Sequence, residues 1–245
     1  MSIIFRDLVE SFETTEELLE FFEFIVSAEQ EQLSDSHKVI LNACHKNPEL
    51  SPGLRSPIKD NLVVLWLNKY KKGLQNRISS RISKKPQTVS DPVIKTIIST
   101  RLEYLSAQDL DKIIGAHRLS MSAENILGLL LEEFLATKLY QYGWHCCWGE
   151  VLRHVDFCHQ DGSLLQVKNR SNSENSSSSR VRINQPIEKW HRVDARTGLC
   201  QWSLFNERFN VDDFSEISFV SFIQDILSKN PQALAIEDDN IWLRE

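Results

Sequence analysis

The sequence lacks the features that mark membrane, secreted and nucleotide-binding proteins. It has no run of about 18 apolar residues, so no membrane span is expected. Its first 22 residues have no basic segment and soon become acidic, which argues against a secretory signal. It has no Walker-type phosphate loop and no GxGxxG pattern, so no nucleotide cofactor is indicated. At 245 residues, 41% hydrophobic and 25% charged, it has an ordinary globular composition.

Cysteine occurs in a number and spacing that argue against a disulfide framework. The five cysteines are odd in number and contain no CxxC pair, which favours reduced thiols in the cytoplasm. Histidines and cysteines do gather between residues 145 and 159. Because neighbouring residues of a strand point to opposite faces, we do not expect four of them to converge on zinc.

Charge is distributed unevenly along the chain. The net charge of −6 argues weakly against a nucleic-acid-binding protein. Both ends are acidic, but residues 61–90 hold seven Lys and Arg and no acid, and residues 163–192 hold six against two Glu. Such basic segments can form a local positive groove, or they can be solvated helix faces.

Helical periodicity dominates the first 140 residues, and a block of strand-forming residues follows. Thr14 and Glu17 form a capping-box pattern, and Ser122 is expected to cap a helix that stops at Gly143. Further helices are expected at 56–83, 92–102, 106–116, 186–195 (closed by Gly198) and 214–228. Strands are expected at 144–149, 151–158 and 163–170, with a turn at 160–162. This order indicates an α/β or α+β fold with a small mixed sheet flanked by helices.

Three residues of the predicted hairpin have the types and spacing of a metal-dependent nuclease. Residues two apart on a strand share a face, so Gln166 and Lys168 point the same way while Val167 turns to the core. Asp156 is expected at the end of the neighbouring strand. Phosphodiester hydrolysis with magnesium needs hard oxygen ligands, an attacking water and a nearby cation. The pattern D-x9-Q-x-K matches the PD-(D/E)xK nuclease signature, with Val155 in place of Pro and Gln166 in place of an acid.

A carboxylate from the preceding helix is expected to supply the charge that Gln166 lacks. Glu132 and Glu133 are the candidates, and we favour Glu132 because it shares a face with Gly128, where the helix could approach the sheet. Taken alone, either glutamate is more typical of an exposed helix acid. The expected catalytic residues are Glu132, Asp156, Gln166 and Lys168, of which the first three would hold Mg²⁺.

The segment after the hairpin has an unusual composition. Residues 164–198 read LLQVKNRSNSENSSSSRVRINQPIEKWHRVDARTG. A serine-rich stretch is typical of a linker, but this one directly follows a catalytic-type strand. Over residues 122–202 the chain resembles the SinI-type restriction endonucleases, which share this block, a K-W-x-R motif and a TG turn. The matching residues are Leu164–Ser179, Arg182, Lys189–Trp190, Arg192 and Thr197–Gly198.

The resemblance implies a type II restriction endonuclease of PD-(D/E)xK fold in a prokaryotic cell, cutting both strands of double-stranded DNA at a site of the GGWCC kind. A cognate DNA methyltransferase would be its functional partner. A two-fold site is cut most simply by a homodimer. The expected organisation is a mainly helical N-terminal region at 1–120 and the nuclease core with its DNA-recognition segment at 121–245, together in one compact domain.

Side chains around the site are expected to contact DNA. Arg suits guanine edges, and Ser suits phosphates, so Arg180 and Arg182 are assigned to base edges and the serines to the backbone. We also favour DNA contact for the basic run at 69–85. The expected DNA-binding residues are Arg170, Asn172, Ser176, Ser177, Ser178, Ser179, Arg180, Arg182, Lys189 and Arg192.

Two other functions fit the same residues. One is an Mrr-like modification-dependent or repair nuclease of the same superfamily, because a Q-x-K pattern is familiar there. The other is a non-catalytic DNA-binding protein in which Gln166 marks a degenerate site. Substrate choice separates the first alternative, and magnesium-dependent digestion of a plasmid separates the second.

Overall fold

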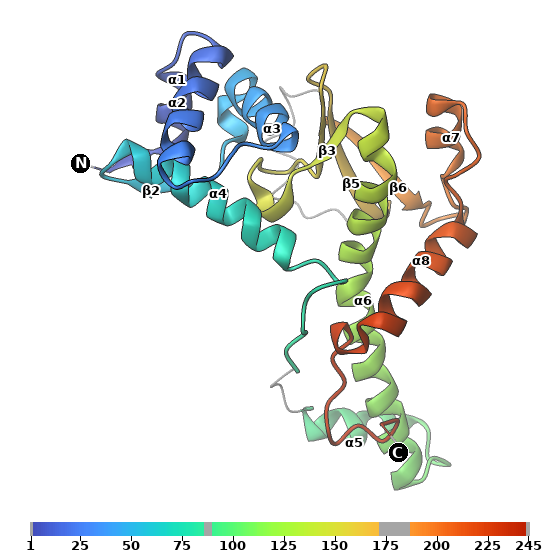
Figure 1. Cartoon of the computed structure of the whole chain (residues 1–245). Helices are drawn as coiled ribbons and strands as arrows, with labels where there is room; N and C mark the ends of the chain where they lie inside the picture. Colours follow the sequence, from blue (N-terminus) through green and yellow to red (C-terminus); the bar gives the residue numbers. More distant parts are fainter. Residues whose placement is uncertain (1, 86–89, 172–186, 244–245) are drawn as a thin grey trace. The chain divides into compact units, whose positions relative to one another are not determined.

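The computed structural model describes residues 2–85, 90–171 and 187–243, and its packing divides the chain into two units (Figure 1). Unit 1 consists of Met1–Arg77 and Leu131–Val220, and unit 2 consists of Ile78–Leu130 and Ser221–Glu245. Each unit combines segments that are far apart in the sequence. The assignment of residues 1–120 to a helical region and of residues 121–245 to a nuclease core stays a prediction.

The N-terminal part of unit 1 is a group of helices with a short two-stranded ribbon. The ribbon pairs β1 (Ile3–Ile4) with β2 (Arg55–Ser56) in antiparallel orientation. The capping box predicted at the start of α2 is confirmed, because the Glu17 N–H donates to the Thr14 hydroxyl at 3.2 Å. The elements are α1 (Phe5–Glu10), α2 (Thr15–Ala28), α3 (Asp35–Lys46), the 3-10 helix η1 (Pro48–Leu50) and α4 (Lys59–Gln75).

A four-stranded mixed sheet forms the rest of unit 1, with the order β3-β4-β5-β6. The first three strands are antiparallel, and β6 runs parallel to β5. The strands are β3 (Trp144–Cys146), β4 (Phe157–His159), β5 (Leu164–Arg170) and β6 (Ile187–Val193). Two short 3-10 helices, η2 (Tyr140–Tyr142) and η3 (Trp148–Glu150), flank β3, and α7 (Ser203–Phe209) follows β6. The expected small mixed sheet flanked by helices is confirmed.

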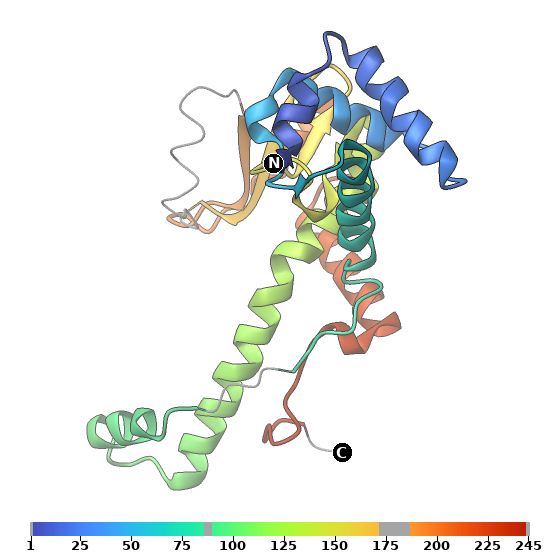
Figure 2. The same cartoon turned by 90° about the vertical axis from the view of Figure 1, so that its left-hand side faces the viewer.

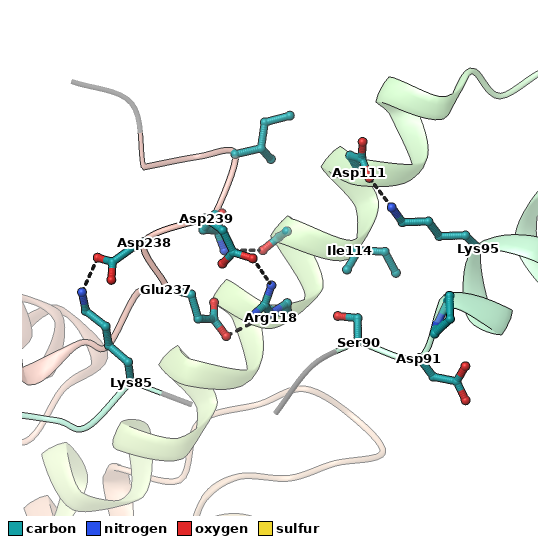
Figure 3. Close-up of a pocket in the computed structure, with 14 residues that line it drawn as sticks. Lys85, Ser90, Asp91, Lys95, Asp111, Ile114, Arg118, Glu237, Asp238 and Asp239 are labelled. Atoms are coloured by element: carbon teal, nitrogen blue, oxygen red, sulfur yellow. Dashed lines mark hydrogen bonds and ion pairs between the residues drawn. The ribbon is translucent and has the colours of Figure 1, made fainter. Parts of the chain in front are cut away.

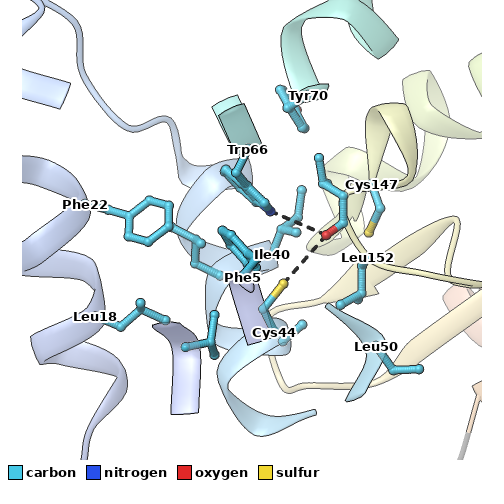
Figure 4. Packing of buried hydrophobic residues seen from close by; sticks show 14 of the residues in the cluster. Phe5, Leu18, Phe22, Ile40, Cys44, Leu50, Trp66, Tyr70, Cys147 and Leu152 are labelled. Atoms are coloured by element: carbon cyan, nitrogen blue, oxygen red, sulfur yellow. Dashed lines mark hydrogen bonds between the residues drawn. The ribbon is translucent and has the colours of Figure 1, made fainter. Parts of the chain in front are cut away.

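The main core of unit 1 joins the N-terminal helices to one face of this sheet (Figure 4). Phe5, Phe22 and Trp66 are fully buried, and the Phe5 and Trp66 rings stack at 6.3 Å between centroids. The Trp66 indole N–H donates to the carbonyl of Val151, which ties α4 to the segment before β4. Burial of such large rings contributes more to folding than any single polar contact.

A second aromatic cluster lies on the α7 side of the sheet. Trp190 of β6 packs against Trp202, with 5.1 Å between ring centroids, and against Phe205 of α7, with 4.7 Å between ring centroids. Phe134 packs against both Trp202 and Phe219. Helices therefore cover both faces of the sheet, which fixes the positions of β4 and β5 between them.

α4 and η3 approach each other so closely that no side chain fits between them. A Cβ atom on Gly73 would lie 2.1 Å from the Gly149 nitrogen. Gly149 itself has φ +75°, and a Cβ there would lie 2.2 Å from the Lys69 carbonyl oxygen. Glycine is required at both positions, and η3 is held firmly against α4.

Unit 2 is built from helices with little apolar burial. It contains α5 (Pro92–Arg101), most of the long helix α6 (Ala107–Leu139), the second half of α8 (Glu216–Lys229) and η6 (Pro231–Ala233). These helices can be followed in Figure 2 by their green and red colours. Ion pairs connect the segments of unit 2 around a cavity of about 770 Å³ (Figure 3). They join Lys85 to Asp238, Lys95 to Asp111, and Arg118 to Glu237 and Asp239.

Several predictions of secondary structure are wrong, among them the strand expected at 144–149, which ends at Cys146, and the helix expected at 56–83, which covers Lys59–Gln75. Ser122 caps no helix, because α6 runs without a break from Ala107 and no residue near Ser122 stops it. Residues 187–193 form the strand β6 rather than a helix, since pairing with β5 outweighs the local signal. The proline at 186 lies outside the described residues. The strand expected at 151–158 is limited to β4, because left-handed Gly149, Glu150 and His154 turn the chain before it.

None of the helices within the described ranges combines the length and the hydropathy needed to cross a lipid bilayer.

Candidate active site

Asp156 is fixed by hydrogen bonds from both neighbouring strands. Its own N–H donates to the Leu165 carbonyl at 3.0 Å, and its carbonyl accepts from the Cys147 N–H at 2.8 Å. Its carboxylate oxygen Oδ2 accepts from the Val167 N–H at 2.7 Å. Asp156 directly precedes β4, whereas the sequence placed it at the end of a strand. The position is corrected, but the carboxylate still lies beside β5 as expected.

Gln166 and Lys168 are two residues apart and lie on the same face of β5. Gln166 is only 4% exposed, and its carbonyl oxygen Oε1 has no hydrogen-bond partner within the described part of the chain. A buried carbonyl without a partner costs about 1–3 kcal/mol, so a ligand that accepts its lone pair would be favourable. Lys168 is half-buried, and Val167 between them is buried as predicted.

Glu132 comes to the same place from the last turns of α6. The charges of Asp156 and Lys168 both act on its carboxylate, which is the juxtaposition that the sequence predicted. The neighbouring Glu133 is buried, but Glu132 is the glutamate whose pKa is raised by the charge of Asp156. A Cβ atom on Gly128 would meet no described atom within 4 Å, and the approach of the helix to the sheet at this residue stays a prediction.

Burial and nearby acidic charges raise the affinity of both carboxylates for a proton or a cation. Burial, followed by the negative charge of Asp156, raises the pKa of Glu132 above its ordinary value, and Lys168 opposes this shift. Burial raises the pKa of Asp156 as well, against the Val167 N–H and Lys168, which both lower it. Two acids that share a buried position bind a divalent cation readily, since the cation removes the repulsion between them.

Glu150 is a third acid near this site, and the sequence reasoning missed it. Its charge raises the pKa of both Glu132 and Asp156. Glu150 has φ 55°, which is rare for a residue other than glycine, and it directly follows left-handed Gly149. A glycine followed by an acid in the turn before the catalytic-type strand was the available signal. Local backbone strain of this kind is common at functional sites.

The candidate metal ligands fit a hard divalent cation without forming an all-carboxylate cage. Among the residues that the structure describes, no three His, Cys, Asp or Glu side chains gather closely enough to hold a metal. Glu132, Asp156 and the partnerless Gln166 oxygen give two carboxylates and one amide carbonyl. Mg²⁺ is commonly held by one or two protein carboxylates, with water and substrate phosphate as the remaining ligands.

The predicted DNA-binding residues fall into three groups. Arg170 at the end of β5 and Lys189 on β6 are exposed, and Lys189 is the register partner of Gln166. Arg192 is engaged within unit 1, where its Nε donates to Asn169 at 2.8 Å and its Nη1 pairs with Glu216. The remaining seven, Asn172, Ser176, Ser177, Ser178, Ser179, Arg180 and Arg182, lie outside the described residues.

The basic run at 69–85 is partly balanced by acids from other segments. Lys71 pairs with Glu31 of unit 1, and Lys85 pairs with Asp238 of unit 2. Arg77 lies over the Trp148 ring at 6.0 Å. The absence of acids within the run itself was therefore a weak reason to expect a DNA surface, and DNA contact stays a prediction.

Comparison with known proteins identifies the family. The family model for the SinI restriction endonuclease matches residues 24–229. The chain belongs to the SinI restriction endonuclease family. It is 40% identical over 207 residues to the type II restriction enzyme SinI of Salmonella infantis, covering 81% of this chain and 89% of that protein. It is also 40% identical over 158 residues to the type II restriction enzyme Eco47I of Escherichia coli, covering 61% and 68%.

The resemblance inferred from the sequence is thereby confirmed. The region matched by the SinI family model contains Glu132, Asp156, Gln166 and Lys168, as well as the whole four-stranded sheet. Membership of a family of restriction endonucleases makes DNA the class of substrate. The roles of individual side chains rest on the geometry described above.

Proposed function

We propose that this protein is a type II restriction endonuclease that makes magnesium-dependent double-strand cuts in DNA at a site of the GGWCC kind. The observation that supports the proposal is that the charges of Asp156 and Lys168 both act on Glu132, while the partnerless Gln166 carbonyl belongs to the same face of β5 as Lys168. These are the ligands and the cation that metal-dependent phosphodiester hydrolysis uses, on a PD-(D/E)xK type of core. Membership of the SinI family supports the same reaction.

Each catalytic side chain has a distinct task. Bound Mg²⁺ neutralises charge on the scissile phosphate and lowers the pKa of water at the site. Asp156, the Gln166 carbonyl and Glu132 would hold the cation, and the Val167 N–H keeps the Asp156 carboxylate in place. The Lys168 ammonium group would orient the attacking water, help to deprotonate it by lowering its pKa, and stabilise the negative charge that develops on the phosphate. In-line attack leaves a 5′-phosphate and a 3′-hydroxyl end.

Sequence recognition is assigned to the segment that follows β5. Arg180 and Arg182 read base edges, while Ser176–Ser179, Lys189 and Arg192 bind the backbone, and replacing either arginine is expected to relax discrimination by roughly 1–3 kcal/mol. Arg192 would have to leave Glu216 to do so. Two copies of the chain act on the two strands, and a cognate methyltransferase protects the DNA of the prokaryotic cell in whose cytoplasm the enzyme works.

Plasmid digestion tests the proposal directly. Wild-type protein with Mg²⁺ is expected to cut unmodified supercoiled plasmid to a fixed set of linear fragments whose ends accept a kinase label only after phosphatase treatment. Lys168→Ala is expected to slow cleavage by about 100-fold or more while it retains sequence-specific binding in Ca²⁺ or metal-free buffer. Lys229→Ala, at an exposed lysine on α8 paired with Asp225, is the matched control and is expected to cut normally.

The outcomes separate the competing functions. Cleavage by Lys168→Ala at the wild-type rate would refute the assigned mechanism. Cleavage only of methylated plasmid would indicate a modification-dependent nuclease instead. Specific binding without any cleavage by the wild-type protein, in Mg²⁺ or Mn²⁺, would indicate a DNA-binding protein with a degenerate site.

A further inference from the structure

Unit 2 leaves more large apolar side chains exposed than it buries. Among its described residues, the buried hydrophobic side chains are Ile78, Leu110, Ile126, Leu130 and Ala233. The large exposed ones are Ile82, Val93, Ile94, Ile97, Tyr104, Ile113, Met121, Trp242 and Leu243. Burial of apolar surface must offset the conformational entropy of the ordered chain, and exposed apolar patches commonly mark interaction sites. Unit 2 therefore has the character of one half of an interface.

α5 shows this shortage of burial most clearly. None of its ten residues is buried, although isolated helices of this length are marginally stable in water. Val93 and Ile97 are 57% and 65% exposed and lie one turn apart, so they form an apolar stripe. Lys95, on the opposite face, pairs with Asp111 of α6 and holds α5 to its own unit (Figure 3). The Val93–Ile97 stripe consequently faces away from α6.

The two ends of α5 carry opposite charges. Asp91 caps the N-terminus by accepting the Val93 N–H at 2.9 Å, and Arg101 is exposed at the C-terminus. In an antiparallel pair of α5 helices about a two-fold axis, the Asp91 end of one lies beside the Arg101 end of the other. The helix dipoles then oppose each other favourably, and the apolar stripe meets its own copy. Two antiparallel copies of α5 are thus complementary to each other in charge and in the placement of their apolar side chains.

We propose that the exposed face of α5, centred on Val93 and Ile97, is the surface through which two copies of this chain form a two-fold dimer. The choice of a second copy as the partner rests on the proposed function, because one chain carries one candidate site and a double-strand cut breaks two phosphodiester bonds. The position of the surface rests independently on the burial and charge pattern of α5.

Sedimentation velocity of the full chain at micromolar concentration tests the surface. The wild-type protein is expected to sediment at twice the chain mass. Ile97→Asp and Val93→Asp each place a charge in the contact and are expected to weaken dimerisation by roughly 100-fold, leaving a folded monomer. Ile217→Asp is the matched control, because Ile217 of α8 is 80% exposed in unit 1, and it is expected to stay dimeric. Circular dichroism confirms that each variant is folded.

Cross-linking locates the contact without depending on a disruptive variant. Ile97 lies near the middle of α5, so the two copies of residue 97 face each other close to the two-fold axis. In a Cys200→Ser background, which removes the exposed thiol, Ile97→Cys is expected to form a disulfide-linked dimer on oxidation with copper phenanthroline. Ile217→Cys in the same background is expected to stay largely monomeric on a non-reducing gel.

The failures of the two proposals are distinguishable. A wild-type protein that is monomeric at micromolar concentration overturns the dimer surface, whether or not it cuts plasmid. If Ile97→Asp leaves dimerisation unchanged and Ile97→Cys gives no cross-link, the assignment of the dimer surface to α5 is overturned. A dimer that behaves as expected but cuts no DNA supports the surface and refutes the proposed function.

Discussion

Where unit 1 packs Phe5, Phe22 and Trp66 ring against ring, unit 2 sets Lys85, Lys95 and Arg118 against acidic side chains. Apolar burial stabilises in proportion to the area removed from water, whereas ion pairs near the surface contribute little unless they are desolvated. Unit 1 should therefore be destabilised most by changes that disturb its packing, and unit 2 by changes that remove a partner from its ion pairs. The candidate active site lies wholly in the unit with the large core, which suits a site whose side chains must be held firmly.

The largest expected effect is on the close backbone contact in unit 1. Gly73→Ala puts a Cβ atom 2.1 Å from the Gly149 nitrogen, so α4 and η3 must separate. We expect a loss of about 3 kcal/mol or more in the free energy of unfolding, measured by urea denaturation. The matched control is Gly128→Ala in α6, where a Cβ meets nothing and helix propensity predicts a gain of about 0.5–1 kcal/mol. Equal effects of the two variants would contradict the assigned contact.

An intermediate effect is expected at the ion pair of unit 2. Glu237 is buried, and Arg118→Met leaves its carboxylate without the guanidinium that bonds it at 3.0 Å. We expect a loss of about 2–3 kcal/mol, because an uncompensated charge stays buried. Hydrogen exchange should rise in peptides from 107–130 and 231–243 and stay unchanged across β3–β5.

The control for that prediction is the exposed pair of unit 1. Arg6→Met breaks the contact with Glu10, in which both side chains are more than 40% exposed, and no change in stability is expected. If both arginine variants were neutral, the ion pairs would not be what holds unit 2 together.

A smaller effect, which depends on pH, is expected from the carboxylates of unit 1. In the metal-free protein the pKa of Glu132 is raised above its ordinary value of 4.5, so the folded state holds this proton more tightly than the unfolded state. This contribution to stability is fully present below about pH 4.5 and is lost as the pH rises through neutrality. Glu132→Gln should therefore raise the Tm at pH 8 by roughly 2 °C or more and change it little at pH 4.

Calorimetry of the metal-free protein at the two pH values measures this difference. Glu16→Gln, at an acid in the first turn of α2, is the control and should show no such gain at pH 8. A Glu132→Gln variant that is less stable than wild type at pH 8 would show that the carboxylate is stabilised rather than strained by its surroundings.

The parts of the fold that local chemistry determines could be predicted from the sequence. The Thr14–Glu17 capping box, the turn after β4 and the left-handed Gly143 after α6 each depend on residues a few positions apart. The strand β6 could not be predicted, because its stability comes from parallel pairing with β5 across more than twenty residues of sequence. The long helix α6 was divided at Ser122 for the opposite reason: a strong local cap signal was overruled by a continuous helix.

The candidate site shows the same division. The two-residue repeat of a strand was enough to predict that Gln166 and Lys168 share a face. Glu132 could be predicted because a neutral Gln166 leaves the metal in need of another carboxylate. Glu150 was missed because its importance arises from the left-handed turn at Gly149, which brings a nominally exposed acid towards the site. The commitment of Arg192 to Asn169 and Glu216 was equally invisible, since Glu216 comes from a helix 24 residues away.

The bond from the Val167 N–H to the Asp156 carboxylate makes the catalytic geometry a matter of strand alignment. A shift of β5 by one residue would present Val167 and Asn169 where Gln166 and Lys168 now stand, and would remove the amide that holds Asp156. The turn at residues 160–163 is therefore constrained in length, and Gly162 within it has φ +97°, a conformation that glycine adopts without strain. An inserted residue that shifted β5 would move Gln166 and Lys168 together away from the Asp156 carboxylate, although every catalytic side chain would still be present.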